Sequence, residues 1–337
     1  MAIIFGTNAA DTLSGTSGND LILAGNGNDV VDGDTGSDVI DGGGGNDTLI
    51  GGAGADVLLG GIGHDLLDGG SDSDILLGGD GDDRLAGRGG DDFLDGGNGN
   101  DTAGYALDTL GVNVDLVLGT ASGAEAGNDT LVSLENVEGG LGDDVIRGDA
   151  GANRLLGGDG DDRLAGRGGN DFLDGGNGSD TAGYAQDTQG VTVDLVAGTA
   201  SGAAAGIDTL VSIENVEGGL GNDIIRGDAG ANRLLGGDGN DRLVGRGGDD
   251  SLTGGLGADT FVFNLGFGQD TITDFAAGTA PGHDIIEIDD AIFADFAAVQ
   301  SASTQVGADV VINAGTDTLT LQNINLASLV ADDFLFV

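Results

Sequence analysis

The chain has no cysteine, lysine or tryptophan, and only one proline among its 337 residues. Without cysteine there are no disulfides and no thiol chemistry, which suits an extracellular protein without proving one. No apolar run is long enough to span a bilayer, so membrane insertion is not expected. The chain has ten arginines and 58 acidic residues, which gives a net charge of −48. This charge disfavours nucleic acids and anionic membranes as partners.

Residues suited to catalysis are equally scarce. The two histidines, His64 and His283, form no H-E-x-x-H motif and no convincing serine triad. His64 occupies a variable turn position and is expected to be a solvated turn residue. Tyr105 and Tyr184 could act in a polysaccharide lyase, but packing is the favoured role for them. We therefore predict no catalytic residue and a protein that is not an enzyme.

Aspartate and glycine, in contrast, are abundant and regularly spaced. Eleven aspartates lie nine residues apart, and each is followed two positions later by an apolar residue such as Leu49 or Leu67. A short strict period is typical of a solenoid, in which each repeat stacks on its neighbours. The eleven aspartates are Asp11, Asp20, Asp29, Asp38, Asp47, Asp56, Asp65, Asp74, Asp83, Asp92 and Asp101.

The repeat unit reads G-G-x-G-x-D-x-(apolar)-x. The glycine-rich part predicts a tight turn, and the remainder predicts a short strand with one side chain pointing inward. Two units then form a coil of eighteen residues, and alternate aspartates line opposite edges. Coils about 4.8 Å apart would bring carboxylates of one edge into mutual repulsion. A hard cation such as Ca²⁺ between successive turns removes that repulsion and accepts carboxylate and carbonyl oxygens.

The run GGGGNDTLIGGAGADVLLGGIGHDLLDGG (residues 42–70) resembles the nonapeptide repeats of RTX proteins. The resemblance covers most of the chain and implies an all-β fold, a parallel β-roll solenoid with several Ca²⁺ ions in both rows of turns. The expected calcium ligands are the eleven aspartates above together with Asp144, Asp162, Asp171, Asp180, Asp223, Asp241, Asp250, Asp259 and the carbonyls of Gly43, Gly45, Gly61, Gly63, Gly79 and Gly81.

The nine-residue phase breaks twice, and the two breaks are copies of one another. Residues 83–161 align with residues 162–240 without a gap, and 12 of the 79 positions differ. In the resumed ladders Asn153 and Asn232 replace the carboxylate, which predicts weak or absent calcium binding at those turns. The expected divisions are a first β-roll (1–101), irregular β-rungs (102–143), a second roll (144–180), a copy of the rungs (181–222), a third roll (223–260) and a C-terminal β cap (261–337).

The last segment differs in composition, since it contains eight of the eleven phenylalanines. A solenoid needs a terminal cap, and bulky apolar residues suit that role. Segment 258–275 resembles the closing segment of RTX proteins, and Asp270 and Asp274 are candidates for a last cation site. The final ADDFLFV resembles an uncleaved signal for the type I secretion machinery, and it also suits an ordinary last strand.

We therefore expect a secreted, calcium-binding protein that folds on Ca²⁺ binding outside a Gram-negative bacterium. The leading role is a structural or adhesive component of the cell surface, matrix or surface layer. This expectation depends on the chain having no catalytic domain before or after the roll. Exposed solenoid ends can pair with other copies, so a homo-oligomer or lattice is a candidate partner. The alternatives are an export and folding module of an enzyme or effector and, less favoured, a polysaccharide-active enzyme.

Overall fold

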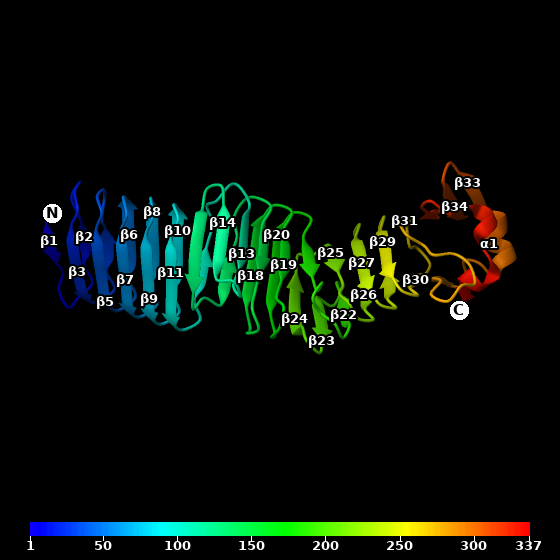
Figure 1. Cartoon of the computed structure of the whole chain (residues 1–337), viewed down its shortest axis with the longest axis horizontal. Helices are drawn as coiled ribbons and strands as arrows, with labels where there is room; N and C mark the ends of the chain where they lie inside the picture. The colour runs from blue at the N-terminus through cyan, green and yellow to red at the C-terminus, as the bar shows by residue number, and fades with distance from the viewer. The chain divides into compact units, whose positions relative to one another are not determined.

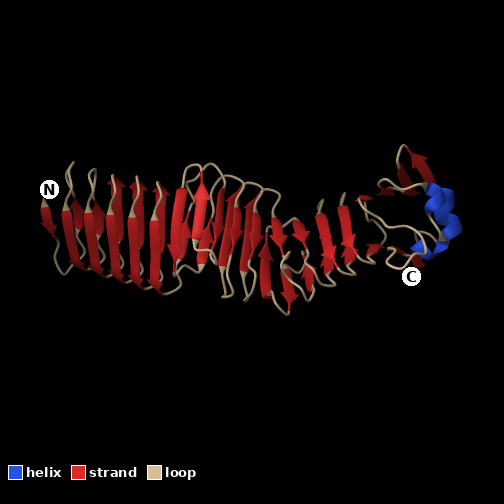
Figure 2. Cartoon of the chain, viewed as in Figure 1, coloured by secondary structure: helices blue, strands red, loops and turns tan.

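The computed structural model describes all residues, 1–337, as two compact units. The first comprises Met1–Gly166 and Asp174–Gly178, and the second comprises Arg167–Leu173 and Ser179–Val337. Strands dominate both units, and the chain forms one short α-helix near its C-terminus (Figure 2). Strand β20 (Phe172–Asn177) contains residues of both units. The expected all-β class is confirmed.

In the first unit the chain alternates between two parallel sheets, so that each coil adds one strand to each sheet (Figure 1). Partners along a sheet are eighteen residues apart, as in Leu58 with Leu76 and Leu49 with Leu67. This register confirms the coil made of two nine-residue units. One sheet contains β1 (Ile3–Phe5), β3 (Leu21–Asn26), β5 (Val39–Gly44), β7 (Val57–Ile62), β9 (Ile75–Asp80) and β11 (Phe93–Asn98), and the other contains β2 (Thr12–Ser14), β4 (Val30–Asp32), β6 (Thr48–Ala53), β8 (Leu66–Ser71), β10 (Arg84–Gly89), β12 (Thr102–Gly104), β16 (Asn136–Glu138) and β18 (Arg154–Asp159).

The core of each coil lies between the two sheets. The apolar residue two positions after each ladder aspartate points inward, and Leu58, Leu67 and Leu76 are all 0% exposed. Because the side chains of a strand alternate between its faces, the residues beside them point outward. Stacking of successive coils therefore turns one inward residue per strand into a continuous apolar column.

A three-stranded meander interrupts the first sheet of this unit at the first phase break. Strand β15 (Gly127–Val132) pairs in parallel with β11, and β14 (Thr120–Gly123) lies antiparallel between β15 and β13 (Val112–Asp115). Strand β13 then pairs in parallel with β17 (Val145–Arg147), and β17 with β19 (Arg163–Ala165). The expected irregular rungs thus include an antiparallel insert, which the sequence pattern did not predict.

The second unit repeats this arrangement and then ends the solenoid. One sheet contains β21 (Thr181–Gly183), β25 (Asn215–Glu217), β27 (Arg233–Asp238), β29 (Ser251–Leu256), β31 (Gln269–Ile272), β35 (Asp317–Leu321), β34 (Asp309–Ala314) and β33 (Ser303–Val306). The other contains β24 (Gly206–Val211), β23 (Thr199–Gly202), β22 (Val191–Asp194), β26 (Ile224–Arg226), β28 (Arg242–Val244), β30 (Thr260–Phe263), β32 (Ile285–Ile288) and β36 (Phe334–Phe336).

The C-terminal segment covers the last coil with aromatic residues. Phe261, Phe263 and Phe267 are at most 1% exposed, and the rings of Phe263 and Phe267 meet edge to face. Helix α1 (Phe296–Ala302) and the 3₁₀ turns η1 (Leu326–Ser328) and η2 (Ala331–Asp333) complete the segment. At the other end Phe5 remains 69% exposed, so Ile3–Phe5 adds a strand without burying its aromatic ring. The division into six segments stays a prediction.

Candidate calcium sites

The ladder aspartates from Asp20 onward are nearly inaccessible to solvent, although they lie in turns. In the first roll each carboxylate from Asp20 to Asp101 reaches back to the preceding coil of its row, whereas Asp11 is half-buried and has no preceding coil. Oδ1 of Asp65 accepts the main-chain N–H of Asp47 at 2.8 Å, and Oδ1 of Asp83 accepts that of Asp65 at 2.7 Å. Asp47, Asp65 and Asp83 are at most 3% exposed. The two predicted rows therefore exist as two continuous series of carboxylates.

The second carboxylate oxygen of most ladder residues has no partner. Burial of a charged oxygen without a hydrogen bond or counter-charge is strongly unfavourable, so each such atom is a position that a cation would stabilise. The aspartates with a buried Oδ2 that accepts no hydrogen bond include Asp29, Asp38, Asp47, Asp56, Asp65, Asp74, Asp83, Asp92 and Asp101 in the first unit, and Asp241, Asp250, Asp259 and Asp270 in the second.

Glycines let main-chain oxygens approach these carboxylates. A Cβ atom on Gly60 would lie 2.5 Å from Oδ2 of Asp65 and 2.5 Å from the carbonyl oxygen of Gly78 in the next coil. Oxygens of two successive coils thus converge on one small space, which is open only because the residue is glycine. Gly61 and Gly63 have φ of 110° and 139°, in the region that favours glycine. All six glycines expected to offer carbonyl ligands have positive φ.

Burial makes the metal-free carboxylates poor acids. It raises the pKa of Asp56 and Asp65 to about 6 and that of Asp74 to about 7. Charge repulsion from neighbours in the same row, such as Asp92 on Asp74, adds to the burial effect. A cation placed among these oxygens would reverse both effects, because it favours the ionised form.

This donor set fits a hard, oxygen-preferring cation. Ca²⁺ takes six to eight oxygens from carboxylates and carbonyls, and the turns provide both. No group of three or more His, Asp or Glu side chains converges anywhere in the chain. Any such ion must therefore take most of its ligands from the main chain, with one or two aspartates from successive coils. Zinc, which prefers histidine and cysteine in a tetrahedral site, fits poorly.

Four predicted ligands differ because a main-chain N–H already reaches their second oxygen. Oδ2 of Asp11 and Asp20 accepts from Thr7 and Thr16, at 2.6 and 2.7 Å. Oδ2 of Asp144 and Asp223 accepts from Gly140 and Gly219, at 2.7 and 2.6 Å. Each of these donors lies four residues before its aspartate. These four carboxylates therefore need a cation less than the others do.

The remaining predicted ligands, Asp162, Asp171 and Asp180, are also at most 3% exposed. Oδ1 of Asp162 accepts the N–H of Asp144 at 2.7 Å, as the row pattern requires. The N–H of Asp171 donates to Asp208, and that of Asp180 donates to Glu214. The copied block therefore continues the row contacts through residues that the nine-residue count did not include.

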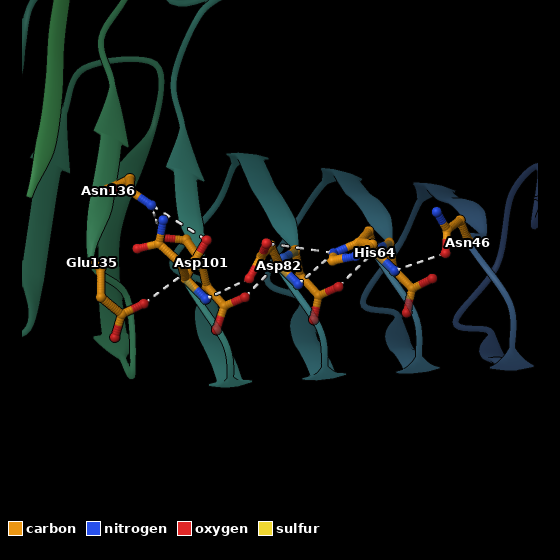
Figure 3. Close-up of polar contacts among 9 residues, drawn as sticks. Asn46, His64, Asp82, Asp101, Glu135 and Asn136 are labelled. Atoms are coloured by element: carbon orange, nitrogen blue, oxygen red, sulfur yellow. Dashed lines mark hydrogen bonds and ion pairs between the residues drawn. The ribbon is translucent and has the colours of Figure 1, made fainter.

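Row members of this kind, which the nine-residue count did not include, also lie in other regions where the spacing changes. Asp129 accepts the N–H of Asp92, Glu135 that of Asp101, and Asp270, already a candidate for a last cation site, that of Asp250. Figure 3 shows Glu135 pointing toward Asp101. Each is followed two positions later by an apolar residue: Leu131, Val137 and Ile272. That signal, without the nine-residue count, would have found them. At Asp270 burial raises the pKa to about 8.

A second, exposed ladder lies one residue before the aspartates, and the sequence analysis missed it too. Its side chains reach forward: Asn46 accepts from the N–H of His64, and Nδ1 of His64 accepts from the N–H of Asp82 at 2.8 Å (Figure 3). Asp82 accepts in turn from Asn100. Adjacent coils are thus joined by two sets of contacts. The ladder aspartates reach back to the preceding coil, and the residues one position before them reach forward to the next coil. His64 is exposed as expected, but it has this specific contact.

Four of the arginines bridge acidic residues. Arg84 meets Glu138, and Arg88 meets Asp68, both at 2.7 Å. In the second unit Arg242 pairs with Glu287 and Arg246 with Asp194. These arginines are therefore not an open basic surface for an anionic polymer.

The two tyrosines are buried, in agreement with a packing role. Tyr105 and Tyr184 are 2% and 4% exposed. Their hydroxyls donate to Asp129 and Asp208 at 3.0 and 3.1 Å. A substrate outside the roll would not reach either hydroxyl.

None of the helices has the length and apolar composition that a membrane crossing requires.

A comparison with models of known protein families agrees with this arrangement. The family model described as "RTX calcium-binding nonapeptide repeat (4 copies)" matches residues 5–40, 32–67, 41–76, 68–103, 135–164, 147–182, 212–243 and 235–272. Among solved structures, the chain is similar to the extracellular lipase LipA from Serratia marcescens, with 24% identity and a TM-score of 0.25. The alignment covers 60% of this chain and 40% of the lipase chain. No curated protein sequence matches.

Proposed function

Because the chain belongs to the family of RTX calcium-binding nonapeptide repeats, we propose that its Ca²⁺ ions bind between successive coils and drive folding outside the cell. The observation that supports this most strongly is the series of buried, unbonded Oδ2 atoms from Asp29 to Asp101. From Asp38 to Asp101 a glycine lies five residues before each aspartate and close to its Oδ2, and at most of them a main-chain oxygen of the next coil lies there too, as at Gly60. Bound Ca²⁺ would supply the positive charge that these oxygens lack.

The charge of the chain makes this folding conditional. At pH 7 the net charge of −48 opposes compaction, and 72 glycines lose much conformational entropy on folding. Ion binding to the folded state alone adds folding free energy that grows with the logarithm of the ion concentration relative to its dissociation constant. Extracellular calcium modules have dissociation constants of about 10⁻⁴–10⁻³ M. We therefore propose an unfolded chain at cytosolic calcium levels and a folded one outside.

A type I secretion system accepts such an unfolded chain, and we propose this route for the protein. The terminal residues ADDFLFV are the proposed signal. After export they would serve a second purpose, since η2 and β36 close the last coil and Phe334 is 7% exposed. The proposed location is the exterior or the cell surface of a Gram-negative bacterium.

For the folded roll we propose a structural or adhesive role at the cell surface, in the matrix or in a surface layer. The roll is a calcium-binding scaffold, and the family match is to repeats and not to a catalytic domain. The burial of Tyr105 and Tyr184 supports the same proposal, because it removes the side chains that a lyase would use. Electron microscopy of the secreted chain with and without Ca²⁺ tests it: ordered assemblies that need Ca²⁺ are expected, and dispersed particles in both conditions would favour the export-module alternative.

A calcium titration tests the folding proposal directly. Circular dichroism of the chelator-treated chain should show a disordered spectrum that becomes β-rich with a midpoint between about 10⁻⁴ and 10⁻³ M Ca²⁺. Mg²⁺ at the same concentrations is the control, because its smaller octahedral shell suits these turns poorly. A β-rich spectrum in excess chelator at pH 7.5 would contradict the proposal.

A further inference from the structure

The row that contains Asp92 does not end at the first phase break. The N–H of Asp74 donates to Asp92 at 2.8 Å, and the N–H of Asp92 donates to Oδ1 of Asp129 at 3.1 Å. Asp129 therefore occupies the next row position, although it lies 37 residues further along the chain. It is 3% exposed, like the row members before it.

The two neighbours differ at their second oxygen. Oδ2 of Asp92 accepts no hydrogen bond, whereas Oδ2 of Asp129 accepts one from the hydroxyl of Tyr105 at 3.0 Å. Burial raises the pKa of Tyr105 well above its ordinary value, so this hydroxyl keeps its proton and remains a donor. At this step a protein side chain thus provides what a cation would provide one coil earlier.

The second copy has the same arrangement. The N–H of Asp171 donates to Oδ1 of Asp208 at 3.0 Å, and the hydroxyl of Tyr184 donates to Oδ2 of Asp208 at 3.1 Å. Tyr184 is 4% exposed and Asp208 is 1% exposed. Both the tyrosine and the aspartate are retained among 79 positions of which 12 differ. The contact is therefore a feature of the insert and not of one copy.

In the other row, the side chain of one row residue in each copy is also fully hydrogen-bonded to protein groups. Asn232 accepts the N–H of Asp228 at 2.8 Å, and its Nδ2 donates to the carbonyl of Glu214 at 2.8 Å. Asn153 makes the same two contacts with Asp149 and Glu135.

The small space beside a glycine, described above for Gly60 and Asp65, is also present at these asparagines. A Cβ on Gly227 would lie 2.1 Å from Oδ1 of Asn232 and 2.7 Å from the carbonyl oxygen of Gly245. Next to this space Arg246 donates to the carbonyl of Gly227 at 2.5 Å and pairs with Asp194. The asparagine thus has an amide that donates to the main chain where a ladder aspartate has an unbonded oxygen, and the guanidinium of Arg246 lies beside it.

One buried carboxylate in the first insert still has an unbonded oxygen. Asp108 lies outside both rows; burial and the nearby charge of Glu125 raise its pKa to about 6, and Arg88 only partly opposes that rise. It does not extend either series of ladder oxygens.

We propose that residues 102–153 and 181–232 are calcium-free joints, in which tyrosine hydroxyls and asparagine amides take the place of the ions that join coils elsewhere. This inference rests on the proposed function, since it assumes that the unbonded Oδ2 atoms take up calcium. Its consequence is that the calcium rows are interrupted at each joint. The first roll and the coils after the second joint then load as separate groups of sites.

Calcium stoichiometry by native mass spectrometry of the full chain tests the proposal. The matched variants are Asp92→Asn and Asp129→Asn, which change neighbouring members of one row in the same way. Asp92→Asn should lower the number of bound ions by at least one and raise the calcium midpoint of folding several-fold. Asp129→Asn should leave both values at those of the unmodified chain, because an amide can still accept from Asp92 and bond to Tyr105.

The second copy provides an independent pair, Asp250→Asn and Asp208→Asn, should either first-unit variant fail to fold. Loss of an ion in Asp129→Asn or Asp208→Asn would overturn the proposal of calcium-free joints and leave the proposed function intact. An unmodified chain that binds no calcium would instead refute the proposed function. The two failures are therefore distinguishable in one experiment.

Discussion

In the first roll, Asp65 and its row neighbours have one oxygen bonded to the preceding coil and a second oxygen with no partner. In the first joint (residues 102–153), Asp129, Asp144 and Asn153 occupy the corresponding positions, and their side-chain atoms meet a hydroxyl, an N–H or a carbonyl instead. The apolar column is the same in both regions. Because the core is the same, the two regions differ in what faces the second oxygen, and on the proposed function this contact sets a coil's need for calcium.

The largest difference is expected at the glycine two positions before the row residue. Gly63 in the first roll has φ of 139°, and a Cβ there would lie 1.9 Å from the carbonyl oxygen of Gly45. Gly151 in the insert has no positive φ, and its nearest neighbour would be Oδ1 of Asp149 at 3.2 Å. Gly63→Ala should destabilise the calcium-loaded chain by more than about 4 kcal/mol, because the backbone must move.

Gly151→Ala is the matched control, with an expected change within about 1 kcal/mol. Thermal unfolding in saturating calcium measures both variants. Equal losses would mean that the turns of the two regions are built alike, which would remove the basis of the comparison.

Truncation of the apolar column should affect both regions equally. Leu67 and Leu155 are each 0% exposed and lie two positions after Asp65 and Asn153. Replacement of either by alanine should cost about 2–5 kcal/mol in saturating calcium, from lost burial and the cavity left behind. Leu107→Ala, at a site that is 66% exposed, is the control and should change stability by less than about 0.5 kcal/mol. A much smaller loss at Leu155 would show that the insert has a softer core.

The regular roll was predictable because its periodicity and its chemistry agree. An aspartate every nine residues, an apolar residue two positions later and glycines before it are enough to give the coil length, both rows and the inward Leu67. Only local rules were needed: positive φ at glycine and the alternation of strand side chains. The burial of Asp65 and its neighbours also follows, since the turns stack directly on one another.

The joints were not predictable from the same rules. The partnership of Asp129 with Tyr105 joins residues 24 positions apart across an antiparallel meander, and no local spacing encodes it. Helix α1 in the C-terminal segment was missed for a similar reason. Its seven residues have weak periodicity, and it is defined by tertiary packing of Val299 and by the N-cap contact of Asp295 with Ala298.

Protons should compete with calcium in the first roll. Burial raises the pKa of Asp65 to about 6 and of Asp74 to about 7, above the ordinary value of 3.8. In the metal-free chain, protonation of these buried carboxylates stabilises the fold below about pH 4, and this stabilisation is lost as the pH rises through 6–7. Calcium requires the ionised carboxylates, so its affinity changes in the opposite direction. The calcium midpoint should therefore be at least about tenfold higher at pH 5.5 than at pH 7.5.

Calcium titrations followed by circular dichroism at the two pH values measure this shift. In the calcium-free chain, the β signal should be stronger at pH 4.5 than at pH 7.5. A midpoint that does not change between pH 5.5 and 7.5 would mean that the carboxylates are already ionised before calcium arrives.

The smallest effect is expected where no ion is involved. Tyr105→Phe removes the hydroxyl from Asp129 and leaves Oδ2 of that residue without a donor. The loss should be about 1 kcal/mol in saturating calcium, the net worth of one buried hydrogen bond. Tyr184→Phe should behave alike in the second copy, because its hydroxyl makes the equivalent contact with Asp208.

The double variant Tyr105→Phe with Asp129→Ala separates this contact from simple loss of packing, because alanine, unlike asparagine, cannot bond to Tyr105. The interaction energy of the pair, measured by thermal unfolding of the two single variants and the double, should be favourable and should not depend on calcium concentration above saturation. An interaction energy of zero would mean that the hydroxyl does not stabilise the carboxylate. Asp129 would then need another counter-charge, and a cation would be the natural one, as it is for Asp92 one coil earlier.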